Sequence, residues 1–109
     1  MGGACELCAR ESVLAENELA YARFDRHSLS AGHVLVVPKR HIATVNDLAH
    51  GDEALVGTLV RRAAAIATER GYAERGYRTV FNCNAEAGQT VFHLHLHLLA
   101  GRALGWPPG

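Results

Sequence analysis

The stretch that decides the fold reads Thr90-Val91-Phe92-His93-Leu94-His95-Leu96-His97-Leu98-Leu99. Histidine alternates with leucine from His93 to Leu98, and successive side chains of a β-strand point to opposite faces of the sheet. The pattern therefore predicts one strand, with the leucines on a buried face and the three imidazoles together on the other. An α-helix would scatter the same histidines around its surface.

Two kinds of chemistry suit three imidazoles on one face. Neutral imidazoles bind metals such as zinc. An imidazole can also act as a nucleophile toward phosphate while its neighbours hold the phosphate oxygens. The remaining interpretation is a solvated strand face without a function, and strict alternation of three histidines favours either chemical role over it.

The composition indicates one small domain with a small partner. The chain has 109 residues, which is enough for one core and too few for two. Lys and Arg total 11 and so do Asp and Glu, so we expect neither nucleic acid nor an acidic membrane as a partner. No signal-peptide pattern opens the chain, and Arg61 and Arg62 interrupt its longest helix-like apolar run. We therefore expect a cytoplasmic protein.

Cys5 and Cys8 form a Cys-x-x-Cys pair. Such a pair is either half of a zinc site or a redox-active dithiol. The redox form usually sits where a strand of a βαβ unit meets a helix, and no such unit precedes this pair, so zinc is favoured if two more ligands exist. Three cysteines in total fit a reducing compartment better than a disulfide framework.

The rest of the pattern predicts an α+β fold, a twisted antiparallel sheet of about five strands with one long helix. Apolar residues recur at helical spacing from Asp52 to Arg70, with Asp52 as the N-cap and Gly71 as the C-terminal stop. The other expected elements, in chain order, are a hairpin over 13–24 with its turn at 16–18, a polar loop over 25–32, a buried strand over 33–37, a helical turn near 46–48, and a strand over 77–82 paired antiparallel with the histidine strand.

The segment from His93 to Leu99 matches His-x-His-x-His followed by two apolar residues, and through it the chain resembles the histidine triad (HIT) superfamily. Gly32–His41, Glu86–Val91 and the Trp106–Gly109 ending also agree, so the resemblance implies a single HIT domain over 1–109, with a Cys-x-x-Cys segment over 1–10 and a tail over 100–109. The ending resembles the Hint branch, whose members are nucleoside phosphoramidases. The 86–91 segment is shared with the Fhit-like branch.

The resemblance implies nucleotidyl transfer to histidine. His95 would attack the α-phosphorus of a purine nucleoside monophosphate joined to an amine or another leaving group, and water would then release the monophosphate. A neutral imidazole is a good nucleophile near pH 7, and imidazolium neighbours would stabilise charge on the phosphoryl oxygens. His97 and His33 match the positions that hold phosphate and orient the nucleophile. Asp25 matches the position at which the family contacts the ribose. The positions of its phosphate-side contacts correspond to Asn82, Gly88, Gln89 and Thr90. Thr90 is also assigned to the catalytic group.

The resemblance also supplies partners for the cysteines. Some bacterial-type members bind a structural zinc through residues that correspond here to Cys5, Cys8, His41 and His93, and a Cys₂His₂ set closes a tetrahedral site. Catalysis itself would require no metal. Two copies would join into one extended sheet as a homodimer, with the Trp106 tail near the partner's pocket.

Three other functions remain open at this point. The same chemistry could act on a dinucleoside polyphosphate, as the Fhit-like segment suggests. A zinc-stabilised nucleotide-binding regulatory module would bind a nucleoside monophosphate without turnover. A catalytic metalloenzyme with the histidine triad as its ligands would lose activity at once on chelation.

Overall fold

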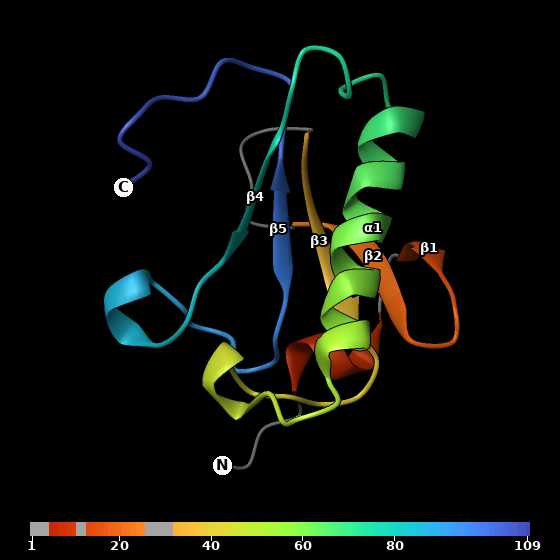
Figure 1. The fold of residues 1–109 in the computed structure, drawn as a ribbon, viewed down its shortest axis with the longest axis vertical. Helices are drawn as coiled ribbons and strands as arrows, with labels where there is room; N and C mark the ends of the chain where they lie inside the picture. The colour runs from red at the N-terminus through yellow and green to blue at the C-terminus, as the bar shows by residue number, and fades with distance from the viewer. Residues whose placement is uncertain (1–4, 11–12, 26–31) are drawn as a thin grey trace.

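A computed structural model describes residues 5–10, 13–25 and 32–109. Within these residues, five strands form one antiparallel sheet in the order β1-β2-β3-β5-β4, and α1 lies across one face of it (Figure 1). The predicted α+β architecture is therefore confirmed. The elements are η1 (Glu6–Ala9), β1 (Val13–Glu16), β2 (Ala20–Phe24), β3 (His33–Pro38), η2 (Val45–Asp47), α1 (Glu53–Glu69), β4 (Arg78–Phe81), η3 (Ala85–Ala87) and β5 (Leu96–Leu99), where η denotes a 3-10 helix.

The sheet separates two hydrophobic clusters, because alternate residues of each strand face opposite sides. The larger cluster lies between the sheet and α1 and contains the alternating leucines Leu94, Leu96 and Leu98. The smaller cluster lies on the other face, where Leu7 of η1 packs against β2 and β3 through Tyr21, Leu35 and Val37. Fully burying one such leucine contributes about 2 kcal/mol. The face opposite α1 is the one that carries the histidine chemistry described below.

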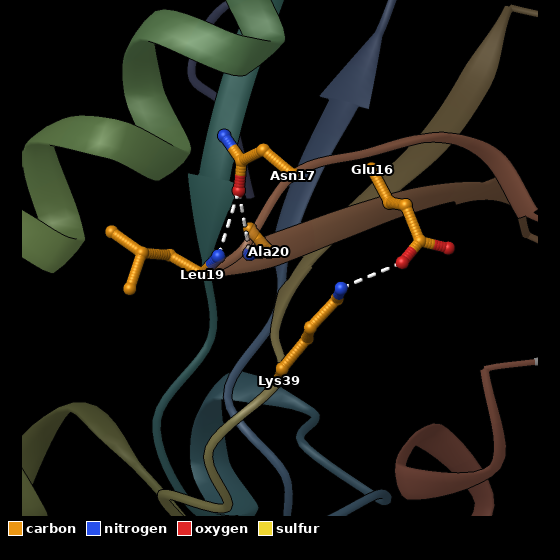
Figure 2. Close-up of polar contacts among 5 residues, drawn as sticks. All are labelled: Glu16, Asn17, Leu19, Ala20 and Lys39. Carbon is orange, nitrogen blue, oxygen red and sulfur yellow. Dashed lines mark hydrogen bonds and ion pairs between the residues drawn. The ribbon is translucent and has the colours of Figure 1, made fainter.

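The predicted hairpin over 13–24 is confirmed as β1 and β2. Figure 2 shows how its turn is held: the side-chain oxygen of Asn17 accepts hydrogen bonds from the backbone N–H groups of Leu19 (2.8 Å) and Ala20 (3.0 Å). Asparagine is favoured in turns for this kind of local side-chain bond. Lys39, directly after β3, forms an ion pair of 2.6 Å with Glu16. The turn is thereby tied to the end of the central strand.

The long helix begins and ends close to the predicted residues. Asp52 occupies the N-cap position, but its side chain makes no capping bond. Its carboxylate instead accepts hydrogen bonds from the backbone N–H of Ala49 and from the Arg40 guanidinium, so the predicted N-cap position is confirmed while the side chain binds groups before the helix. At the other end Gly71 has φ +84°, and its N–H and that of Tyr72 bond to carbonyls of the last turn. This pattern is a Schellman motif, which glycine favours because it tolerates positive φ.

The histidine strand is shorter than predicted. β5 starts only at Leu96, so His93 and His95 lie in the segment before it, and the prediction of one strand from Thr90 to Leu99 is wrong. Leu96 is the first residue of β5 with a partner, and it pairs with Val36 of β3 and with Phe81 of β4. The backbone N–H of Leu94 bonds to the carbonyl of Ile42 instead, at 2.6 Å. Leu94, Leu96 and Leu98 still enter the same cluster across this boundary, so the three imidazoles remain on the side of the sheet opposite α1, as predicted.

The strand predicted over 33–37 is present as β3, the strand over 77–82 as β4, and the helical turn near 46–48 as η2. Most of the predicted loop over 25–32 falls outside the described residues. The tail lies near β4, where Arg78 donates a hydrogen bond to the carbonyl of Gly105 at 2.8 Å. Trp106 in this tail is 82% exposed in the single chain. Among the described residues, no helix has the length and apolar character needed to cross a membrane.

Gly32 offers a test of how tightly the start of β3 is packed. A Cβ at Gly32 would lie 2.1 Å from the carbonyl oxygen of Ala100, whereas a Cβ at the exposed Gly57 in α1 would meet nothing within 4 Å. We expect Gly32→Ala to lower the free energy of unfolding by about 2 kcal/mol through this clash. Gly57→Ala should raise it by about 0.5–1 kcal/mol, because alanine is the better helix former. Urea unfolding of both variants measures these free energies of unfolding. A Gly32→Ala protein with the free energy of unfolding of the wild type would contradict the close approach of Gly32 to Ala100.

Candidate active site and metal centre

His93 is completely buried at the end of β3. Its Nε2 lies 2.7 Å from the carbonyl oxygen of Pro38, and because a carbonyl only accepts, Nε2 carries the proton. The lone pair is then on Nδ1, which lies 3.1 Å from the sulfur of Cys5 and 3.3 Å from that of Cys8. Burial lowers the pKa of His93, and the bond to Pro38 opposes this effect. The imidazole is therefore neutral near pH 7 and presents a ligand atom to the two cysteines.

His41 completes a four-residue group with Cys5, Cys8 and His93. Its Nδ1 lies 3.4 Å from the sulfur of Cys8, and the donor atoms of the group all lie within 4.8 Å of one another. Tetrahedral zinc with bonds of about 2.3 Å to sulfur and 2.0 Å to nitrogen would separate S and N ligands by about 3.5 Å. The observed distances are only slightly shorter, so these side chains could hold a metal after a small expansion. The hydrogen bond with Cys5 raises the pKa of the Cys8 thiol, so binding must displace a proton.

A pocket of about 180 Å³ opens on the same side of the sheet. Its lining combines residues expected from the sequence with walls that the sequence did not indicate. The expected residues are Asp25, Asn82, Gly88, Gln89, Thr90, His95 and His97, and the additional ones are Glu6, Leu7, Leu35 and Val91. Of the residues expected in the active site, His33 alone does not line this pocket; it contacts His97 from the side.

His95 is oriented by the backbone two residues before it. Its Nδ1 lies 2.7 Å from the carbonyl oxygen of His93, so Nδ1 donates and the lone pair of the neutral ring is on Nε2. This carbonyl is available because His93 lies outside the ladder, where strand pairing does not use it. The ring centroid of His95 lies 4.9 Å from that of His97. The lone-pair nitrogen of His95 thus belongs to a half-buried ring that lines the pocket beside a second imidazole.

His97 lies in β5 opposite Leu35, and His33 lies two residues earlier on the same face of β3. This register brings His33 Nε2 to 2.9 Å from His97 Nδ1. Asp25 Oδ2 lies 3.3 Å from His33 Nε2, and Asn82 Nδ2 lies 3.4 Å from His97 Nε2. The cluster therefore joins residues from two strands, β3 and β5, with the residues that directly follow β2 and β4.

Both histidines of this cluster are poor bases. Burial, reinforced by His95 and His33, lowers the pKa of His97 to about 4. Burial also lowers the pKa of His33, although the carboxylate of Asp25 opposes the shift. His97 is therefore neutral near pH 7 in the free protein, and the imidazolium neighbours predicted for the reaction are not present before a phosphate binds.

The loop before β5 is organised by Gln89, whose side chain is buried. Its Oε1 accepts from the backbone N–H of Asn84 at 2.8 Å, and its Nε2 donates to the carbonyls of Ala43 (2.9 Å) and Val91 (3.1 Å). These bonds fix the loop that carries Gly88 and Thr90 to the pocket. Sequence reasoning missed this anchoring role, because nothing local indicates that a glutamine will reach Ala43. It also missed Leu7, although an apolar residue enclosed by Cys-x-x-Cys could have indicated a buried turn.

Comparison with known proteins agrees with this geometry. The family model of the HIT domain matches residues 7–104. The chain is 40% identical to the purine nucleoside phosphoramidase of Escherichia coli over 93 residues. The aligned region covers 85% of this chain and 78% of that relative. It is 44% identical over 97 residues to an uncharacterized HIT-like protein of Synechococcus elongatus, covering 89% of this chain and 84% of that one.

Solved structures give the same result. A HIT family hydrolase from Legionella pneumophila superposes with a TM-score of 0.91 at 40% identity, covering 97% of this chain and all of that one (100%). A zinc-bound histidine triad family protein from Mycobacterium smegmatis superposes with a TM-score of 0.73 at 30% identity, covering 91% of this chain and 76% of that one. From the triad, the fold and these relatives together, we conclude that the chain belongs to the histidine triad (HIT) family.

Proposed function

We propose that this protein hydrolyses the bond between the α-phosphate of a purine nucleoside monophosphate and an amine, with His95 as the nucleophile. The observation that carries the proposal is the hydrogen bond from His95 Nδ1 to the carbonyl of His93, which leaves the Nε2 lone pair for attack. The phosphoramidase relative from Escherichia coli supports both the purine and the amine leaving group.

The reaction would proceed in two displacements. His95 Nε2 forms a bond to the α-phosphorus while the bond from phosphorus to the amine breaks, and the amine leaves with the electron pair and gains a proton from solvent. The imidazolium so formed keeps its Nδ1–H bond to the carbonyl of His93, which stabilises its positive charge. Water then attacks phosphorus and the bond from phosphorus to His95 breaks; one proton of the water stays on the monophosphate, the other passes to solvent, and His95 returns to the neutral form.

The neutral imidazoles of His33 and His97 beside His95 determine which groups would bind an anionic phosphate. Because His97 is uncharged, charge on the phosphoryl oxygens is met by N–H and O–H donors rather than by imidazolium. Such donors are available from the His97 ring, which His33 orients, and from Thr90 and Gly88 of the loop that Gln89 anchors. Asn82 would add an amide donor, and the carboxylate of Asp25 would accept from ribose hydroxyls.

Replacing the nucleophile gives the first test of this function. We expect His95→Ala to lower kcat for adenosine 5′-phosphoramidate by about a thousandfold or more, because no other group can form the intermediate. Mass spectrometry of the wild-type protein during turnover should find an adenylyl adduct on His95. His50→Ala removes an exposed histidine outside the pocket and should leave kcat unchanged. Undiminished turnover of His95→Ala would overturn the assignment.

The same assay separates the two nearest alternatives. Faster release of adenosine monophosphate from a diadenosine polyphosphate than from the phosphoramidate would make the protein a dinucleoside polyphosphate hydrolase. Tight binding of adenosine monophosphate without turnover of either substrate would make it a zinc-stabilised regulatory module. The phosphoramidase assignment requires the phosphoramidate to be the better substrate in kcat/KM.

We also propose that Cys5, Cys8, His41 and His93 bind a structural zinc ion, as the fit of their donor distances and the zinc-bound mycobacterial neighbour support. Purified protein should contain one zinc per chain, and Cys8→Ser should lose it. Cys83→Ser, which removes the one cysteine outside the group, should retain it. A chelator should lower the melting temperature, because the metal stabilises the N-terminal turn, while the folded protein keeps turning over. Immediate loss of turnover at unchanged fold would favour the metalloenzyme instead.

A homodimer is the proposed assembly. Within the described residues β4 is an edge strand, and open edges favour pairing with another chain. The tail beside β4 exposes 82% of Trp106, a large apolar surface that a second copy could cover. Sedimentation at micromolar concentration should give twice the chain mass of 11.7 kDa. A monomer under these conditions would contradict the proposal.

A further inference from the structure

A second set of metal-ligand atoms lies beside the pocket, separate from the Cys/His group. Asp25, His33 and His97 are each half-buried, and their donor atoms lie within 4.8 Å of one another. His33 Nε2 is the centre of the set, at 2.9 Å from His97 Nδ1 and 3.3 Å from Asp25 Oδ2. The donors come from β3, β5 and the residue that follows β2. The sheet therefore assembles two imidazoles and one carboxylate around one point.

The distances within this set suit zinc and similar ions. Tetrahedral zinc with bonds of about 2.0–2.2 Å separates its ligand atoms by about 3.3–3.5 Å. The separation of 3.3 Å between Asp25 and His33 already fits, and the two imidazole nitrogens need to move apart by only about 0.5 Å. Two histidines and one carboxylate also form a set that leaves the fourth zinc position open. Magnesium and calcium prefer oxygen-only sites, so the donor types select a transition metal.

Metal binding requires a lone pair on both facing nitrogens. In the free protein one proton lies between His33 Nε2 and His97 Nδ1, as their hydrogen bond shows. This proton can move through solvent to the outer nitrogen of the same ring, so neutral imidazoles bind the metal without net proton release. When the proton moves to Nε2 of His97, this nitrogen becomes a donor that faces Asn82. The Asn82 amide lies 3.4 Å away and can turn its oxygen toward the Nε2–H group to accept a hydrogen bond.

We propose that Asp25, His33 and His97 bind a second divalent metal of the zinc type, and that this metal inhibits the enzyme. Asp25 and His97 line the pocket together with His95, so a bound ion takes up the side chains that would contact ribose and phosphate. The metal-binding part of the proposal stands on the donor geometry alone. The inhibitory part rests on the proposed hydrolase function.

Cobalt titration tests the metal-binding part without any nucleotide. Metal-free protein should bind two equivalents of Co²⁺, one with thiolate-to-cobalt charge-transfer absorption and one without it, because the second site contains no sulfur. Cys5→Ser combined with Cys8→Ser should remove the first signal and retain the second. Asp25→Asn should weaken the second equivalent at least about tenfold and leave the first unchanged. Glu86→Gln removes the same charge from an exposed position in η3 and should change neither.

His33→Gln provides a second ligand deletion and should give the same loss as Asp25→Asn, with circular dichroism to confirm the fold. Uptake of one equivalent by the wild-type protein, or a second equivalent that both deletions leave unchanged, would overturn the site.

With adenosine 5′-phosphoramidate, Zn²⁺ beyond one equivalent should raise KM and a chelator should reverse the effect. If turnover is unchanged when the second equivalent of metal is bound, the inhibitory part of the proposal is overturned and the metal-binding part is not. A second equivalent without any turnover would instead refute the hydrolase proposal and leave the metal site standing.

Discussion

Burial of His93 at the end of β3 is the constraint on which both candidate sites depend. Its imidazole is fully enclosed and donates to the carbonyl of Pro38, which directs the other ring nitrogen toward Cys5 and Cys8. The same position keeps its backbone out of the β5 ladder, so its carbonyl can accept from His95. One residue thus places a candidate metal ligand on one side and orients the proposed nucleophile on the other. A strand that continued through His93 would have used this carbonyl or turned it away.

The N-terminal turn connects the two sites a second time. Cys5 and Cys8 enclose Glu6 and Leu7, and these two residues form part of the wall of the pocket. Leu7 is 2% exposed, and its carbonyl accepts from the hydroxyl of Tyr21 in β2. Burial of one leucine and one hydrogen bond are modest anchors for a four-residue turn. A metal on the flanking cysteines would add the strongest restraint on that wall.

Burial, rather than net charge, determines the electrostatics of the pocket. His97 lies next to two other imidazoles and within a sheet, so the charged form loses hydration and meets like charge. The carboxylate of Asp25 raises the pKa of His97 but is outweighed. The pocket therefore offers neutral donors and lone pairs, which suits both a phosphate held by hydrogen bonds and a cation of the zinc type. This duality is a consequence of placing uncharged imidazoles beside a carboxylate.

The sequence by itself determined the local features: alternation placed Leu94, Leu96 and Leu98 in the core, helical spacing predicted α1, and the turn residues predicted the hairpin. The triad pattern also named most of the pocket through the family resemblance. Only the tertiary structure decided where the histidine strand begins, since that depends on where β3 and β4 stop pairing with it. It likewise decided which nitrogen carries the proton in His93 and in His95, and that His97 is neutral. Those properties depend on carbonyls, burial and neighbours that are distant in the chain, and a local pattern contains no information about them.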